Sequence, residues 1–419
     1  MRILFLAQII PYPLDAGPKV KTWNVLRYLV GCGHKVTFVS YVRPEELAYV
    51  GELKALCSEV HVVPLKRQRV LEPLYLARSV LTGRPFLIER DDRKAMRDLV
   101  ARLATEKHYD VIHADQINMP QFAEYALRYA ADPKPALIFD AHNAVWVILD
   151  RSAKDTRWFL KPLLGMEARK MRAYEGRLVR DFDCTMAVSE VDRRYLLEAA
   201  EAANGKRPLP QIPVIPIAVN TQELQPVTRR NPSKNILTLG TLHYPPNAEG
   251  IRWFLQEVFP LVKARIPAAT IAILGKHPPK DFQDLAAGAP ETYLVPGYVP
   301  DLTGWLEKAA VMVVPVRVGG GMRVRILEAF ARGMPVVTTT IGLEGIDARV
   351  GEDVLVEDDP QRFADAVVRV LEDTDLQDTL AKNSRKLAEE RYDWKVVLDQ
   401  LEQVYRGIEQ QRAGLKKTR

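Results

Sequence analysis

Short runs of aliphatic and β-branched residues alternate along the chain with longer segments in which apolar residues recur every three or four positions. The short runs predict buried strands, and the longer segments predict amphipathic helices. In the first half of the chain the expected strands lie at 2–8, 35–41, 60–65, 110–114, 136–142, 184–189 and 213–217. The expected helices lie between them, at 20–30, 90–107, 121–131, 152–180 and 190–203. Such alternation is typical of a parallel α/β sheet.

A second series of the same kind begins near residue 235. Its expected strands lie at 235–240, 269–275, 292–297, 311–316, 335–340 and 353–357. Its expected helices lie at 248–265 and 302–308, and another helix follows a glycine-rich loop after residue 316. Two successive parallel sheets predict two Rossmann-like domains facing across a cleft, with ligands at the carboxyl ends of the strands.

The predicted domain boundaries follow from a change of pattern. Residues 221–234 (TQELQPVTRRNPSK) lack periodicity and are rich in polar residues and proline, as linkers are. We therefore expect an N-terminal domain at 1–220 and a C-terminal domain at 235–391. Residues 392–419 are expected to form a helix that returns to the N-terminal domain and ends in a basic tail.

The glycine-rich loop is the strongest chemical signal in the chain. The loop residues expected to bind a ligand phosphate are Gly319, Gly320, Gly321 and Met322. Consecutive glycines leave backbone N–H groups unshielded, and the helix that follows directs the positive end of its dipole to the same place. The segment therefore predicts a binding site for a nucleotide or a sugar nucleotide.

Three charged residues follow this loop on the predicted helix. Arg323 and Arg325 are two positions apart, so their side chains diverge by about 200°. We expect Arg323, which is nearer the helix N-terminus, to contact the ligand diphosphate. Glu328 suits the hydroxyls of a ribose, and a solvated helix residue is the alternative interpretation.

Polar residues also end several strands of the first series. Asp115 and His142 follow buried runs and are expected at one edge of the sheet, where His142 would contact a sugar directly. His113 is a candidate for the same edge, and a histidine buried in its strand is the equal alternative. Gly17, after the first strand, would allow a ligand close to the backbone, and an ordinary turn explains it equally well.

The loops of the second series add two weaker candidates, Thr241 after the strand at 235–240 and Tyr298 in the loop at 296–301. The glycine loop lacks the Gly-Lys-Ser/Thr ending of a P-loop. The sequence shows no metal-ligand spacing and no Asp-x-Asp pair. We therefore expect no metal and no cofactor beyond the nucleotide-sugar substrate.

Composition narrows the class of protein. The chain has 419 residues, 47% hydrophobic and 27% charged, which is typical of a globular protein of two or three domains. Cys32, Cys57 and Cys184 have neither a disulfide nor a metal spacing, which favours the cytoplasm. Pro11 and Pro13 interrupt the apolar N-terminus, so a buried strand is expected there rather than a signal peptide. No apolar run approaches the ~20 residues that span a bilayer.

The positive charge is concentrated in one segment. Residues 151–180 contain nine basic and three acidic residues, a net +6 that equals the charge of the whole chain. Trp158, Phe159 and several leucines are interleaved with the basic residues, which suits an anionic membrane surface and a lipid-linked acceptor. Helices packed on the sheet with a solvated basic face are the alternative. Nucleic acid is not an expected partner, since no recognised motif supports it.

The segment PVRVGGGMRVRILEAFARGMPVVTTTIGLEGI resembles the nucleotide-sugar site of family 4 glycosyltransferases, retaining enzymes of the GT-B fold. PYPLDAGPKVKTWNVLRYL, YDVIHA, AVSEVDRRYL, IPIAVNT and RYDWKVVLDQLEQVY support the resemblance along nearly the whole chain. The resemblance implies sugar transfer from a nucleotide donor, with Glu328 as the second glutamate of the family's E-x7-E motif. It also implies that Gly17 lies near the donor phosphates, and Asp115 and His142 near the transferred sugar.

Two departures from the family pattern change what is expected of the site. Gly320 stands where the first glutamate of E-x7-E should lie, so the sugar contacts of that glutamate are not expected here. The usual Arg…Lys phosphate pair is missing from GTLHYPPNAEG (240–250). We infer that Arg323 and Arg325 neutralise the diphosphate instead, which fits a subgroup that lacks the first glutamate. His142, Asp115 and Arg323 are then the expected catalytic residues.

The leading hypothesis is a metal-independent retaining glycosyltransferase acting on a cell-surface polysaccharide, a glycolipid or a lipid-linked acceptor. It would be cytoplasmic, with peripheral contact at the inner face of the membrane. A nucleotide-sugar epimerase of similar fold is one alternative. A degenerate glycosyltransferase that only binds is another, suggested by Gly320.

Overall fold

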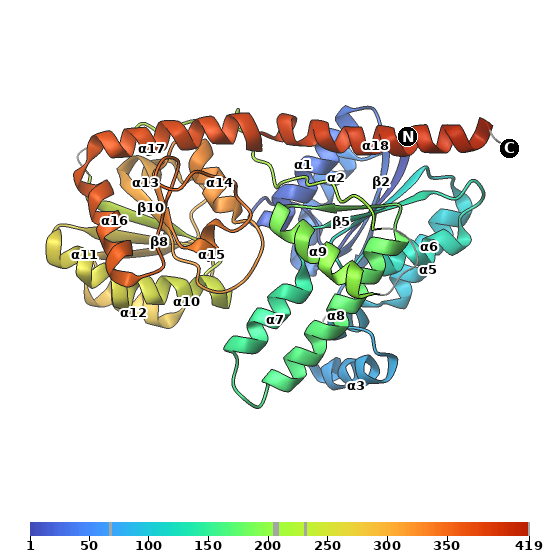
Figure 1. The fold of residues 1–419 in the computed structure, drawn as a ribbon, viewed down its shortest axis with the longest axis horizontal. Coiled ribbons are helices and arrows are strands. Elements are labelled where there is room, and N and C mark those ends of the chain that lie inside the picture. The colour runs from blue at the N-terminus through green and yellow to red at the C-terminus, as the bar shows by residue number, and fades with distance from the viewer. Residues whose placement is uncertain (67–68, 204–208, 230–232, 418–419) are drawn as a thin grey trace. The chain divides into compact units, whose positions relative to one another are not determined.

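A computed structural model describes residues 1–66, 69–203, 209–229 and 233–417. Residues 230–232 of the expected linker and 418–419 of the expected basic tail lie outside the described residues. The chain divides into two compact units (Figure 1). Unit 1 comprises Met1–Ile217 and Val397–Arg419, and unit 2 comprises Ala218–Val396.

Unit 1 is built on a six-stranded parallel sheet in the order β3-β2-β1-β4-β5-β6. Its strands are β1 (Arg2–Ala7), β2 (Lys35–Val42), β3 (Glu59–Pro64), β4 (Val111–Asp115), β5 (Ala136–Ala141) and β6 (Cys184–Ala187). Every residue of β4 and β5 is buried, as expected when helices cover both faces of a parallel sheet. The predicted strand at 213–217 forms only an isolated bridge, between Val214 and Ala187.

Helices connect these strands. They are α1 (Gly17–Gly31), α2 (Val50–Leu56), α3 (Glu72–Thr82), α4 (Phe86–Asp91), α5 (Lys94–Glu106), α6 (Pro120–Tyr129), α7 (Val145–Asp155), α8 (Lys161–Asp181) and α9 (Glu190–Ala202). Short 3-10 turns lie at Pro44–Tyr49 and Arg69–Leu71. The prediction of a single helix at 90–107 and of another at 152–180 was wrong, because each region holds parts of two helices. Thr156 is extended at the end of α7, and Pro162 lies in the first turn of α8, where the absent N–H of a proline costs nothing.

Unit 2 repeats the architecture in the order β12-β11-β10-β7-β8-β9. Its strands are β7 (Asn235–Leu239), β8 (Thr270–Leu274), β9 (Tyr293–Gly297), β10 (Ala309–Val314), β11 (Val336–Thr338) and β12 (Leu355–Val356). Its helices are α10 (Pro245–Trp253), α11 (Phe259–Arg265), α12 (Lys280–Gly288), α13 (Thr303–Lys308), α14 (Val324–Ala331), α15 (Thr340–Leu343), α16 (Pro360–Glu372) and α17 (Thr374–Leu387). Two π-helical turns, Phe254–Val258 and Ala388–Tyr392, interrupt the helical runs.

Helix α18 (Trp394–Lys417) begins in unit 2, and its residues from Val397 onward belong to unit 1. It is joined to unit 1 by polar contacts: Tyr28 Oη donates a hydrogen bond to Asp399, and His34 Nε2 lies 3.2 Å from a Glu402 carboxylate oxygen. The predicted fold, two Rossmann-like sheets with a C-terminal helix at the N-terminal unit, is confirmed. Within the described residues, no helix has the length and apolar character needed to cross a bilayer.

Each sheet reverses its strand order at one point, between β1 and β4 in unit 1 and between β7 and β10 in unit 2. In open α/β sheets the crevice at such a reversal, outside the carboxyl ends of the strands, is where ligands bind. These two edges are therefore the candidate ligand sites of the protein.

Candidate functional site

The carboxyl edge of the first sheet gathers side chains from three neighbouring strands. Asp115 ends β4 and is in register with Ala7 of β1 and with Asp140 of β5. His142 follows β5 directly. Parallel pairing therefore brings Asp115 and His142 to one edge of the sheet, as the sequence predicts.

Asp115 is fully buried, and its carboxylate accepts three hydrogen bonds, one of them from the neighbouring Gln116 Nε2 at 3.4 Å. Thr22 Oγ1 donates to one oxygen at 2.8 Å, and His142 Nε2 lies 2.8 Å from the other. Because a carboxylate accepts, the histidine tautomer assigned here carries its proton on Nε2. Nδ1 of His142 is buried and has no hydrogen-bond partner among the described residues, so it remains an acceptor for a ligand hydroxyl.

Asp140 lies at the centre of a second buried group. Lys21 Nζ binds one of its carboxylate oxygens, and His113 Nε2 lies 3.6 Å from the other. Burial alone would raise the pKa of Asp140, but the Lys21 ammonium and the two nearby histidines outweigh it and hold this pKa below its usual range. His113 is buried and its Nδ1 is hydrogen bonded at 2.7 Å to Tyr405 Oη. His113 is therefore a histidine buried in its strand, which is the second of the two interpretations of this residue.

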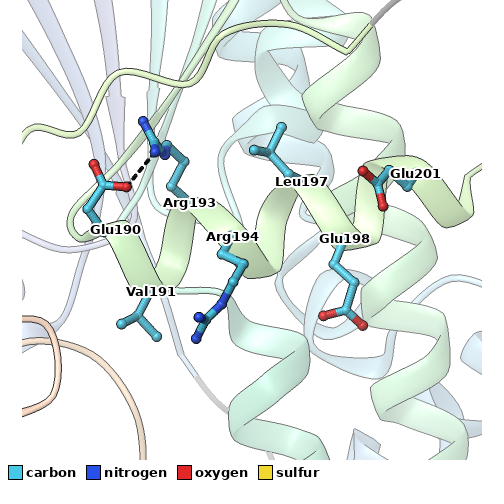
Figure 2. Close-up of a pocket in the computed structure, with 7 residues that line it drawn as sticks. All are labelled: Glu190, Val191, Arg193, Arg194, Leu197, Glu198 and Glu201. Atoms are coloured by element: carbon cyan, nitrogen blue, oxygen red, sulfur yellow. Dashed lines mark ion pairs between the residues drawn. The ribbon is translucent and has the colours of Figure 1, made fainter.

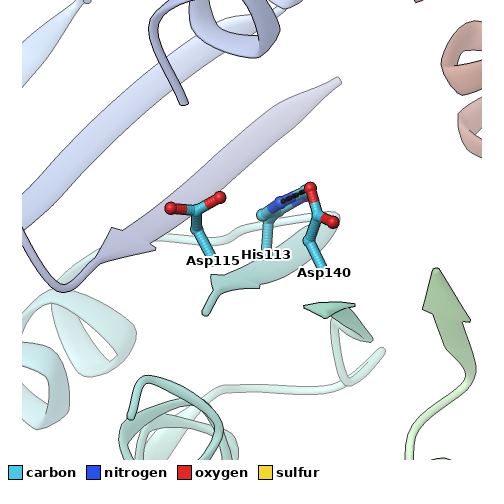
Figure 3. A group of neighbouring side chains, drawn as sticks. All are labelled: His113, Asp115 and Asp140. Atoms are coloured by element: carbon cyan, nitrogen blue, oxygen red, sulfur yellow. Dashed lines mark ion pairs between the residues drawn. The ribbon is translucent and has the colours of Figure 1, made fainter. Parts of the chain in front are cut away.

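His113, Asp115 and Asp140 form a group that the linear sequence does not reveal (Figure 3). One ligand-type atom from each of them lies within 4.8 Å of the others, as in a metal site. However, Lys21 already balances the charge of Asp140, and Thr22 already binds Asp115. A divalent cation would have to displace the buried Lys21 ammonium, so this group fits an internal polar network better than it fits a metal.

Gly17 is the first residue of α1, which starts after the loop that leaves β1. Pro18 follows in the first turn, and the Ala16 cap position offers no side-chain hydrogen bond. Lys19 is paired with Asp15 at 3.0 Å. Gly17 therefore lies at a helix N-terminus at the switch point of the first sheet, where free N–H groups favour an anion.

In unit 2, residues 315–323 connect β10 to α14 at the corresponding switch point. Gly319 and Gly321 have φ angles of 121° and 81°, conformations that residues with a side chain rarely adopt. α14 begins at Val324, with Arg323 in extended conformation at its cap. The loop is therefore shaped by glycine, as the sequence predicts.

Only Arg325 lies on the helix, because α14 begins at Val324, and both arginines already have partners. Arg323 Nη1 donates to the carbonyls of Gly320 and Gly321 in its own loop. Arg325 donates to Leu239 O and to Asn247 Oδ1, both at 2.9 Å, and so joins α14 to the end of β7 and to α10. Burial, together with the charge of Arg323, lowers the pKa of Arg325 to about 9.

Glu328 lies one turn further along α14 and is half-buried. Burial raises its pKa to about 7, although Arg332 and Arg325 oppose the rise. The hydrogen bonds of the described residues include none to its carboxylate. Glu328 is therefore a poorly solvated carboxyl with unused acceptors on the helix that follows the glycine loop.

The remaining candidates lie in loops at the same edge of the second sheet. Thr241 follows β7, and its carbonyl accepts a hydrogen bond from Asn247, the residue that also binds Arg325. Tyr298 follows β9, is 54% exposed, and lies under Lys276 Nζ at 4.6 Å from the ring centre. The structure thus connects Thr241 to the glycine-loop helix through Asn247, whereas no hydrogen bond joins the Tyr298 side chain to that helix among the described residues.

A surface hollow along α9 lies apart from these candidates (Figure 2). It is lined mainly by charged residues, including Glu190, Arg193, Arg194 and Glu198. Glu190 and Arg193 pair with each other at 2.6 Å. Opposite charges that already pair on one helix face make no specific ligand site.

Sequence reasoning missed several residues that organise these two edges: Lys21, Thr22, Asp140, Glu175, Asn247 and Tyr405. Glu175 is an example. It is buried on α8 and accepts hydrogen bonds from the N–H groups of Val145 at 2.8 Å and Trp146 at 2.9 Å, so it caps α7 just after His142. The signal available in the sequence was an acidic residue inside a basic helix, which does not reveal its distant partner.

Both halves of the chain resemble known proteins. Residues 16–209 match the family described as glycosyl transferase 4-like domain, and residues 233–373 match the family described as glycosyl transferases group 1. The phosphatidyl-myo-inositol mannosyltransferase of Mycobacterium leprae is 24% identical over 322 residues, which cover 75% of this chain and 78% of that protein. An uncharacterized 44.6 kDa protein of the cps region of Klebsiella pneumoniae is 25% identical over 173 residues, 40% of this chain and 45% of that protein.

Solved structures show the same fold. The Anabaena protein Alr3699/HepE, crystallised with UDP and glucose, superimposes with a TM-score of 0.66 and 16% identity over 97% of this chain and 100% of that one.

Proposed function

Because the chain belongs to the group 1, GT4-like family of glycosyltransferases, we propose that it is a retaining, metal-independent enzyme that moves a sugar from a nucleotide-diphosphate donor to a saccharide or lipid-linked acceptor. The observation that carries the proposal is the glycine loop at 319–322, which lies at the switch point of the second sheet and leads into α14 with Glu328. A phosphate-binding loop and a carboxyl with unused acceptors are the two parts that a nucleotide diphosphate requires.

In this proposal the donor binds to unit 2, which contains the expected domain at 235–391. The N–H groups of the glycine loop and Arg323 hold the diphosphate, with Arg323 exchanging its loop carbonyls for phosphate oxygens. Glu328 accepts hydrogen bonds from the ribose hydroxyls. Thr241 and Tyr298 contact the nucleotide from neighbouring loops. Arg325 supports the loop and adds positive charge, since its own hydrogen bonds are directed to Leu239 and Asn247.

The acceptor and the transferred sugar are assigned to unit 1, with the expected domain at 1–220. His142 directs its unpartnered Nδ1 to a sugar hydroxyl, while Asp115 fixes the ring and its tautomer. Gly17 lets the sugar diphosphate approach the N-terminus of α1. Residues 221–234 serve as the linker, and 392–419 as the returning helix with its tail.

The proposed reaction is a same-face substitution. The bond between the anomeric carbon and the leaving phosphate oxygen breaks, and the acceptor oxygen bonds to the same face of that carbon. The acceptor proton passes to the leaving phosphate. Charge grows on the diphosphate as its bond breaks, and fixed N–H donors with an arginine stabilise that charge more in the transition state than in the ground state. A glycosyl group trapped on an enzyme carboxylate would contradict this mechanism.

The acceptor is proposed from the surface of unit 1. Segment 151–180 has a net charge of +6 and includes exposed aromatic residues, which supports an acceptor at an anionic membrane surface of the cytoplasm. The relatives suggest the first donors to test: UDP-glucose, because Alr3699/HepE was crystallised with it, and a nucleotide-activated mannose.

A thermal-shift screen with UDP-, GDP-, ADP- and CMP-sugars tests donor binding. A ligand at 100 times its dissociation constant adds about 2.7 kcal/mol to the free energy of unfolding. We expect one class of sugar nucleotide to raise the melting temperature, and Glu328→Ala and Arg323→Ala to abolish the rise. Glu372→Ala, an exposed glutamate of α16, is the matched control and should keep it.

The same proteins separate catalysis from binding alone. Slow release of free sugar from the donor, lost in Glu328→Ala but not in Glu372→Ala, would exclude a subunit that only binds. Release of an altered sugar nucleotide without an acceptor would identify an epimerase. No shift with any sugar nucleotide would contradict the proposed donor site.

A further inference from the structure

Large apolar side chains are exposed where α7 turns into α8. Trp158, Phe159 and Leu160 are 81%, 54% and 39% exposed in the turn at 156–160. The rings of Trp158 and Phe159 contact each other edge to face, with centres 6.0 Å apart, and rest on no other ring of the described residues. Contiguous exposed apolar surface of this kind usually marks an interaction site.

A second apolar surface lies on α3. Leu74 and Leu81, seven residues apart, share one face of the helix and are 61% and 87% exposed, with the exposed Ala77 between them. Val80 is exposed as well. The opposite side of the helix holds the buried Ser79. α3 is thus an amphipathic helix whose apolar face has no partner among the described residues.

Hydrogen bonds fasten α3 to the first turns of α8. Lys170 Nζ donates to Ser79 O at 3.1 Å and to Ser79 Oγ at 2.9 Å, and it pairs with Glu167 at 2.9 Å. Glu167 in turn accepts a hydrogen bond from the N–H of Phe86 at 2.7 Å. α3 therefore lies against the first half of α8, the half that follows the turn at 156–160 (Figure 1).

Basic side chains surround the turn and are available to a partner. Arg157, Lys161 and Arg169 are exposed, and the side chains that the structure describes include no ion-pair partner for them. By contrast, Lys154 is paired with Asp150, and Arg78 with Glu89. Among the side chains that the structure describes, these basic residues near the apolar turn therefore carry positive charge that no ion pair compensates.

We propose that α3 and residues 156–161 form one surface, the docking surface, that binds an anionic lipid bilayer. Trp158, Phe159, Leu74 and Leu81 enter the boundary between headgroups and acyl chains, and Arg157 with Lys161 meets the lipid phosphates. The bilayer is chosen as the partner because unpaired cations flank exposed aromatic residues, which is the composition that suits an anionic interface. The proposal deepens the proposed function, since it brings unit 1 to a lipid-linked acceptor.

Flotation of the full chain with vesicles tests the docking surface, using phosphatidylcholine alone or mixed with phosphatidylglycerol. We expect binding only to the mixed vesicles. Leu74→Ser/Leu81→Ser and Trp158→Ser/Phe159→Ser should each weaken it at least tenfold, since each pair removes two large apolar side chains from the interface. Arg157→Gln/Lys161→Gln should weaken it roughly fivefold per removed charge at low salt. Leu294→Ser, an exposed leucine of β9 in unit 2, is the control and should bind normally.

Undiminished vesicle binding by Leu74→Ser/Leu81→Ser would overturn the proposal. A wild-type dimer in sedimentation that this variant abolishes would also overturn it, because the surface would then bind a second copy of the chain. Brominated lipid in the vesicles should quench the part of the tryptophan fluorescence that Trp158→Phe removes. This quenching gives a readout that does not depend on a variant's stability. Absence of that quenching would also overturn the proposal. Donor-induced thermal shifts should persist in all docking variants. A wild-type protein that binds vesicles but no sugar nucleotide would contradict the proposed function and leave the docking surface standing.

Discussion

Tyr405 Oη and His113 Nδ1 are joined by a hydrogen bond of 2.7 Å between side chains 292 residues apart in the chain. Both side chains are fully buried, and their rings are nearly parallel. Tyr405 belongs to the part of α18 that packs with unit 1, and His113 approaches Asp140, the partner of Lys21. The last helix thereby contributes to the polar network under the candidate sugar site.

Tyr405→Phe should therefore destabilise unit 1 without creating a large cavity. Removing the hydroxyl leaves His113 Nδ1 buried and unpaired, which costs roughly 1–3 kcal/mol of unfolding free energy. Urea unfolding followed by circular dichroism measures the loss. Tyr129→Phe removes the hydroxyl of a half-exposed residue that lies 3.2 Å from Tyr125 Oη, and it should change the stability little. Equal stability of the two variants would show that the Tyr405–His113 bond adds nothing.

Glu175 should make the stability of unit 1 depend on pH. Burial raises its pKa to about 8, although the N–H groups of Trp146 and Val145 oppose the rise. Between its ordinary value near 4.5 and about 8, the folded protein holds a proton that the unfolded chain has lost. The free energy of unfolding contributed by this group therefore falls as pH rises through that window.

Denaturant unfolding of the wild type and Glu175→Gln at pH 5, 6, 7 and 8 tests this. The difference between the two proteins isolates Glu175 from other titrating groups. We expect the wild type to lose stability relative to the variant as pH rises. A constant difference at all four values would contradict the raised pKa.

Donor binding should depend on the ionisation of Glu328. Its pKa is raised to about 7 by burial, so near neutral pH the free protein holds part of this carboxyl protonated. A carboxylate accepts both ribose hydroxyls, whereas a protonated carboxyl loses one acceptor. We expect the affinity for the sugar nucleotide to rise from pH 6 to pH 8 in calorimetric titrations. Glu328→Gln should bind weakly and lose this dependence, and a wild-type profile as flat as that of the variant would count against the assigned role.

Gly250 tests the packing beneath the glycine loop. A Cβ at this position of α10 would lie 2.1 Å from the carbonyl oxygen of Pro315, in the segment that leads to the loop. Gly250→Ala should shift that segment, lower stability by about 1–3 kcal/mol and weaken donor binding. Gly304→Ala in α13, where a Cβ meets open space, should be neutral or slightly stabilising. Thermal unfolding with and without the donor measures stability and donor binding in both variants. Unaltered stability and donor binding in Gly250→Ala would mean that the loop tolerates the shift.

The strands could be predicted because each is a short apolar run that both faces of a sheet bury, and the order of strands and helices then restricts the topology. The helix breaks at 92–93 and 156–160 were missed because local periodicity continues across them. A full strand was expected at 213–217 because the run looks apolar. Only the bridge at Val214 forms, because Pro213 and Pro216 interrupt the pairing.

The sequence by itself determined the two sheets, the glycine loop and the neighbourhood of Asp115 and His142, since residues that end adjacent parallel strands must share an edge. Only the tertiary structure decided what holds these residues. Lys21 and Asp140 are 119 residues apart, Tyr405 and His113 are 292 apart, and Arg325 reaches Leu239 across 86 residues. Such pairs leave no local pattern, because a buried charge or hydroxyl needs a partner in space and that partner can come from anywhere in the chain.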